Sequence, residues 1–178
     1  VASGQWLPDV RIRAGGADAL GDAPGAPARL VGLDEIVAST PDVVVICCCG
    51  RSARGAAAEV EEHLLVVDAF RALPAARRGN VFVVPHETFS RPGPRVVDAV
   101  ETVAALLRPD DLPRTLVAKA VAGVLRLVVD GDASWRWEPV DGATERDAAA
   151  AETVSESPSE RGAVATERGE ARGAPVER

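Results

Sequence analysis

The stretch that decides the fold is Asp42-Val-Val-Val-Ile-Cys-Cys-Cys49, in which seven apolar residues follow one aspartate without interruption. Such a run is typical of a strand covered on both faces, as in a parallel sheet between helices. A helical stretch, Ser52–Leu65, follows it with Ser52 placed as N-cap. A second apolar segment, Val81–Val84, ends at Pro85. These two strands and their helical neighbours predict an α/β fold with a small, mostly parallel sheet flanked by helices.

Proline and glycine mark the ends of further helices along the chain. Pro8 begins the first of these helices, and Gly15-Gly16 follow its end. Pro41 ends the second helix, which begins near Leu33. A well-patterned helix follows Pro94, with its apolar residues at helical spacing. The helices expected on these grounds are Pro8 to Gly15-Gly16, Leu33–Ser39, Ala69–Arg78 and Pro94–Leu107.

Residues 110–140 allow two interpretations. Thr115–Val129 is apolar and suits one more helix. Alternatively, Leu125–Val129 pairs with Ser134–Val140 as a hairpin across Asp130-Gly131. The last 38 residues, Asp141–Arg178, hold nine acidic residues and five arginines with very little to bury, which predicts a disordered acidic tail. The chain therefore divides into residues 1–109, 110–140 and 141–178.

Composition excludes several classes of protein. The 178-residue chain is 47% hydrophobic, which indicates a globular domain, and its formal charge of −7 argues against a nucleic-acid partner. No apolar run reaches the length of a membrane span, and Val1–Trp6 shows no signal peptide. The three consecutive cysteines, 47–49, have neither zinc-ligand spacing nor the geometry of an easy disulfide, because neighbouring side chains point to opposite faces.

The loop after the second strand is the most informative segment. Pro92 and Pro94 fix their φ angles, so the turn into the last helix is stiff. This loop leaves the carboxyl end of a strand, which is where open α/β sheets bind ligands. Residues 87–90 are therefore expected on a rigid rim. The alternative is an ordinary strand-to-helix connection with Phe89 folded into the core.

Four ordered blocks resemble the cobalamin-type substrate-binding proteins of ABC importers, within the siderophore and vitamin class. The strongest is FSRPGPRVVDAVETVAALLRP, which is similar to the closing motif of that family. The others are GQWLPDVRIRAGGADALG, GLDEIVASTPDVVVICCCG and ALPAARRGNVFVV. Together the blocks cover about Ala2–Pro109.

The resemblance implies the Rossmann-like C-terminal lobe of a two-lobe binding protein that holds its ligand between the lobes. We expect the chain to start after the helix that joins the lobes, so that the first lobe is absent. The implied ligand is cobalamin or a related corrinoid, with siderophore-like molecules and haem bound by relatives, and the implied location is extracytoplasmic. No resident cofactor is expected.

The resemblance also assigns residues. Trp6, Glu87, Phe89, Ser90 and Arg91 are expected to line the ligand side of the lobe. For Trp6 the alternative is packing beneath the lobe.

An acidic helix supplies the second assigned surface. Asp34 and Glu35 match the surface that docks on arginines of the membrane permease in full-length relatives. The alternative is an acidic first turn that complements the helix dipole.

Two other readings of the chain remain. One is a small thiol-dependent enzyme that uses Cys49, activated by Arg51, Arg54 and the helix that starts at Ser52. The other is a degenerate fragment without function. His86, beside Glu87, is placed to reach a metal or haem, but a lone exposed histidine is more often only solvated; the sequence predicts no metal site and no catalytic residue.

Overall fold

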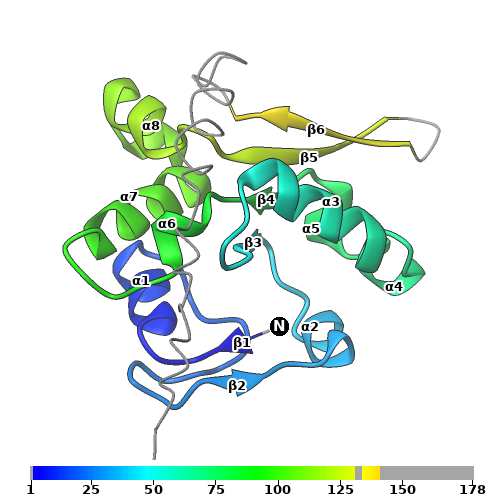
Figure 1. Ribbon diagram of the computed structural model, residues 1–178, viewed down its shortest axis with the longest axis horizontal. Helices are drawn as coiled ribbons and strands as arrows, with labels where there is room; N and C mark the ends of the chain where they lie inside the picture. The colour runs from blue at the N-terminus through cyan, green and yellow to red at the C-terminus, as the bar shows by residue number, and fades with distance from the viewer. Residues whose placement is uncertain (1, 131–133, 141–178) are drawn as a thin grey trace, which may run out of the picture.

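The computed structural model describes residues 2–130 and 134–140, and the predicted disordered tail, 141–178, lies outside the described residues. The chain has an α/β fold in which helices flank a small sheet, as expected, and this sheet has four strands (Figure 1). Its helices are α1 (Leu7–Arg13), α2 (Leu33–Ala38), α3 (Ala53–His63), α4 (Asp68–Arg71), α5 (Pro74–Arg77), α6 (His86–Phe89), α7 (Val96–Leu107), the 3-10 helix η1 (Pro109–Asp111) and α8 (Arg114–Ala120). Its strands are β1 (Ala2–Ser3), β2 (Arg29–Leu30), β3 (Val44–Ile46), β4 (Val81–Val83), β5 (Leu125–Val129) and β6 (Trp135–Pro139).

The main sheet has the order β3-β4-β5-β6. β3 and β4 are parallel, with Val44 opposite Val81, whereas β5 is antiparallel to both β4 and β6. The expectation of a mostly parallel sheet is therefore corrected to a mixed sheet with one parallel pair. The reason is that the hairpin β5–β6 adds to the open edge of β4, while β1 and β2 form a separate antiparallel pair.

The two interpretations of residues 110–140 are both correct in part. Residues 114–120 form the helix α8, and the hairpin β5–β6 follows it. The hairpin completes the same sheet and contributes Leu125 and Leu127 to the core. This segment is therefore an integral part of the fold that holds residues 1–109.

Strand β4 separates two apolar clusters, because its side chains alternate between the faces of the sheet. Val81 and Val83 join the α3-side core, which also holds Val60, Phe70 and the hairpin leucines. Phe82, and Val84 directly after the strand, join the α7-side core, together with residues of α1, α6, α7 and the segment after α8. Figure 1 shows the corresponding layers, with α3 to α5 on one side and α1, α6 and α7 on the other.

Local signals account for most element boundaries. The Ser52 hydroxyl accepts a hydrogen bond from the Gly55 N–H at 3.2 Å, which confirms the predicted N-cap. The helix expected over Ala69–Arg78 is divided into α4 and α5, because Pro74 begins a new helix there. The loop expected after Pro85 contains one helical turn, α6.

Replacing Leu127 by alanine tests whether the hairpin belongs to the cooperative core. Leu127 is fully buried, so we expect the free energy of unfolding to fall by about 2–5 kcal/mol, measured by urea denaturation. The control is Leu30→Ala, since Leu30 is 87% exposed and its truncation should change stability by no more than about 0.5 kcal/mol. Equal losses of stability in the two variants would contradict the placement of Leu127 in the core. A gradual, non-cooperative transition of the unmodified chain would support the interpretation as a degenerate fragment.

Candidate functional site

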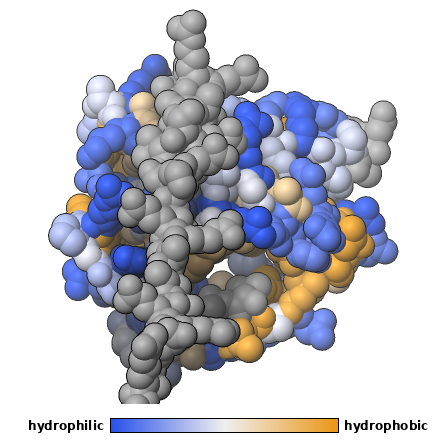
Figure 2. All heavy atoms as spheres, viewed as in Figure 1, coloured by the Kyte–Doolittle hydropathy of each residue, from blue (hydrophilic) through white to orange (hydrophobic). Residues whose placement is uncertain are grey.

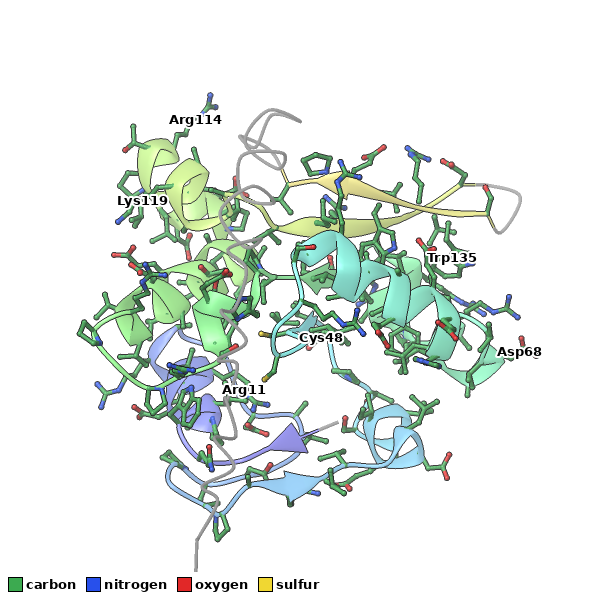
Figure 3. The ribbon with its side chains drawn as sticks, viewed as in Figure 1. Arg11, Cys48, Asp68, Arg114, Lys119 and Trp135 are labelled. Atoms are coloured by element: carbon green, nitrogen blue, oxygen red, sulfur yellow. The ribbon has the colours of Figure 1, made fainter. Side chains whose placement is uncertain are left out.

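The candidate site lies where the two parallel strands end. Because β3 and β4 run in the same direction, the segments that follow them leave at one edge of the sheet. The Val84 N–H donates to the Ile46 carbonyl at 2.9 Å and holds the two exits side by side. We call residues 47–50 and 85–91 the carboxyl edge. Figure 3 labels Cys48 in this region, near the centre of the molecule.

The three cysteines alternate at this edge as expected. Cys47 packs against the α7-side core and Cys48 against the α3-side core, while Cys49 is exposed. The Cys47 Sγ lies 4.0 Å from the Pro85 carbonyl oxygen and 3.8 Å from the His86 carbonyl oxygen. The Cys47 thiol therefore links the two loops of the carboxyl edge.

The environments of Cys47 and Cys48 disfavour thiolate chemistry. Burial, and then the neighbouring Cys49, raise the pKa of Cys47 to about 11. Burial, followed by the charge of Glu59, also raises the pKa of Cys48. Arg51, one of the cations that the thiol hypothesis assigns to Cys49, lies with its Nη2 2.8 Å from the Glu59 Oε1. The thiol hypothesis remains a prediction about Cys49 alone.

A single helical turn presents the polar residues of the edge. Pro85 precedes α6, and the Ser90 N–H donates to the His86 carbonyl at 2.9 Å. The Ser90 hydroxyl donates to the same carbonyl oxygen. The His86 Nε2 lies 3.0 Å from the Glu87 Oε1, and the His86 Nδ1 lies 3.5 Å from the Ser90 Oγ. The turn therefore groups a histidine, a carboxylate and a hydroxyl.

The aromatic residues assigned to the ligand lie deeper than the polar ones. Phe89 is only 8% exposed and packs in the α7-side core. This is the alternative arrangement, a strand-to-helix connection with its aromatic ring in the core, so the ring offers no open face. Trp6 is half-buried against the same core, and Arg91 is exposed. Of the five assigned residues, the surface presents Glu87 and Arg91 most openly.

The acidic helix α2 is partly engaged within the chain. The Glu35 Oε1 lies 2.7 Å from the Arg29 Nη2, and a hydrogen bond from that guanidinium lowers the pKa of Glu35. Asp34 is exposed. Figure 2 shows apolar surface gathered at the lower right of this face, where Figure 1 places α2. The exposed large hydrophobic residues include Leu30 and Val66.

Two tryptophans on the hairpin have indole N–H groups whose burial without an acceptor could not be predicted from the sequence. Trp135 and Trp137 are two residues apart on β6 and both pack against the α3-side core. Their indole N–H groups are buried and have no hydrogen-bond partner among the described residues. Alternation within a strand suggests a shared face, but it does not indicate the lack of an acceptor.

Comparison with known proteins adds no assignment, since no protein-family model and no curated protein matches the chain. Within residues 2–130 and 134–140, no three His, Cys, Asp or Glu side chains are grouped so as to hold a metal ion. Among the helices described here, none has the length and apolar character needed to cross a bilayer.

The raised pKa of Cys47 predicts a loss of stability in alkali. Between pH 9 and about 11 the thiol ionises in the unfolded chain but stays protonated in the folded chain, so the unfolded state loses the proton first. The free energy of unfolding should therefore fall as the pH rises through this window. Urea midpoints measured from pH 8 to 11 check this.

The variant Cys47→Ala should show a shallower decline than the unmodified chain over the same pH range. The variant Cys49→Ala is the matched comparison: it removes only the smaller cause of the raised pKa of Cys47 and leaves the burial of that thiol, so most of the decline should remain. An unchanged slope in Cys47→Ala, relative to the unmodified chain, would contradict the assigned environment of this thiol.

Proposed function

We propose that the chain is one lobe of the substrate-binding component of an ABC importer, and that the carboxyl edge contacts a corrinoid, with cobalamin as the reference ligand. The second lobe would cover the opposite side of the ligand. The observation that carries the proposal is a polar rim at the carboxyl edge of β3 and β4, held by the hydrogen bonds of Ser90 to the His86 carbonyl, together with the four blocks of resemblance. No covalent step is required of a binding protein.

The rim is suited to a ligand that carries both apolar and amide surface. The Glu87 carboxylate accepts hydrogen bonds from amide N–H groups, and the Arg91 guanidinium donates to amide carbonyls. Their backbone is fixed by Pro85, by the hydrogen bonds to the His86 carbonyl and by the burial of Phe89. Because the buried ring anchors α6 to the core, we assign Phe89 the support of the rim, and the polar side chains the contact with ligand.

The acidic helix α2 supports the second half of the proposal, which is docking on a basic membrane permease. Asp34 is free to meet an arginine from a partner, whereas Glu35 would have to exchange its contact with Arg29. Attraction between exposed charges of this kind steers association and weakens with salt. Asp34 is therefore the residue of the pair whose charge is open to a partner.

One lobe buries about half of the ligand surface that two lobes would bury, so we expect a dissociation constant on the order of 0.1–1 mM for the isolated chain. Titration of the ¹⁵N-labelled chain with cyanocobalamin, followed by NMR, should shift amide signals of residues 47–50 and 86–91. Glu87→Gln and Arg91→Gln should each weaken binding about tenfold, since each removes a charged hydrogen-bond partner.

Arg114→Gln is the matched control, because Arg114 begins α8 and lies at the upper edge of the molecule in Figure 3, away from Cys48. No amide shift at millimolar cyanocobalamin, or shifts confined to β5–β6, would contradict the binding proposal. A submicromolar dissociation constant would contradict the single-lobe interpretation, because one lobe would then bind the ligand as tightly as two lobes are expected to.

A further inference from the structure

The hairpin leaves one edge of the main sheet open along β6. The strand order makes β6 an outer strand, and Figure 1 shows it at the top of the molecule with β5 on its inner side. Within residues 2–130 and 134–140, no strand pairs with the other edge of β6. This edge has five residues, whereas the opposite outer strand, β3, has three. The β6 edge is therefore the longer template for a further strand.

The hydrogen bonds of the hairpin show which backbone groups face this open edge. The Asp130 N–H donates to the Ser134 carbonyl at 2.9 Å, so Ser134 directs its backbone groups towards β5. The direction alternates along an antiparallel strand, so residues 136 and 138 also face β5. Trp135, Trp137 and Pro139 therefore direct their backbone groups outwards. Pro139 has no N–H to leave unpaired there, which is why proline is tolerated on an edge strand.

The side chains between these outward residues carry opposite charges. The Arg136 Nε lies 2.6 Å from the Glu138 Oε1, and the guanidinium also contacts the Asp130 carboxylate. The Arg136 side chain is 47% exposed and that of Glu138 is 46% exposed. A second copy of β6 that runs antiparallel, with Trp137 opposite Trp137, sets Arg136 of each copy opposite Glu138 of the other. The edge is therefore complementary in charge to itself.

One register satisfies both the backbone and the charges. With the two Trp137 residues opposite each other, each Trp137 N–H donates to the other Trp137 carbonyl, and each Trp135 N–H donates to the Pro139 carbonyl of the other copy. Sliding one copy by two residues sets Arg136 opposite Arg136, or Glu138 opposite Glu138, and like charges at opposite positions destabilise a sheet. Charges and proline usually protect an edge from pairing. Here their order excludes the neighbouring registers and admits one.

We propose that the chain forms a two-fold symmetric dimer through β6, with Trp137 at the symmetry axis and the two four-stranded sheets joined into one. Each copy uses its β6 edge once, so the association closes at two copies. The contact involves one strand of each copy, and we expect a dissociation constant on the order of 0.1 mM. The inference is independent of the proposed function, because no residue of the carboxyl edge belongs to β6.

Sedimentation equilibrium of the chain, at concentrations from about 10 µM to about 1 mM, tests the dimer with a charge exchange. Arg136→Glu and Glu138→Arg each set like charges opposite one another, so each should weaken the dimer about tenfold. An equimolar mixture of the two variants restores unlike charges at both positions and should associate as tightly as the unmodified chain. The control is Arg71→Glu, which makes the same charge change beside Asp68 on α4 and should leave the dissociation constant unchanged.

Hydrogen exchange of the unmodified chain gives a second measurement that depends on no variant. The amides of Trp135 and Trp137 should be protected at about 1 mM but not at about 10 µM, whereas those of Arg136 and Glu138, which face β5, should be protected at both. A monomer at every concentration, a dimer unaffected by both charge variants, or a mixture no tighter than the separate variants would overturn the proposal. None of these results alters the expectation for cyanocobalamin at the carboxyl edge.

Discussion

The fold depends on strand β4, because it is the one strand of the described sheet whose residues are all buried on both faces. Val81 and Val83 reach one core, while Phe82 and Val84 reach the other. A polar substitution at any of these positions would place an unpaired group in an apolar cluster. The parallel partner β3, the antiparallel hairpin and the helices on both sides are therefore assembled around a single short segment.

The same strand determines the chemistry available at the carboxyl edge. Val84 bonds to Ile46, Pro85 ends the strand, and one turn of helix brings His86, Glu87 and Ser90 together within five residues. Burial of Phe89 on the inner side of this turn fixes which side chains remain outside. A buried strand end is thus followed directly by a polar rim whose backbone is held by hydrogen bonds and by packing of Phe89 on the core. Such preorganisation lowers the ordering cost of binding a ligand.

Local signals made part of this structure predictable. The starts of three helices could be predicted from Pro8, Ser52 and Pro94, because capping and a fixed φ angle act over only a few residues. The apolar run after Asp42 predicted a strand, although only Val44–Ile46 pairs regularly. The hairpin could be recognised as one of two options, but its pairing with β4 could not, because a long-range edge contact leaves no local pattern.

Less of the candidate site could be predicted from the sequence, again because its geometry depends on long-range contacts. The loop after β4 was correctly placed at the carboxyl end of a strand, and its prolines indicated stiffness. The side to which Phe89 turns depends on tertiary packing against α7 and the neighbouring helices, so the rim and core alternatives were equally consistent with the sequence. The contact of Cys47 with the His86 carbonyl joins residues 39 positions apart, beyond any motif.

Hydrogen exchange with and without excess cyanocobalamin is the most direct measurement of the central proposal, that β4 positions an edge which binds a ligand. Amides of β4 should exchange slowest in both states, because their exchange requires unfolding of both cores. Ligand should slow exchange at residues 86–91 and 47–50 while leaving β6 and α8 unchanged. Protection of β6 or α8 with an unaltered carboxyl edge would contradict this account.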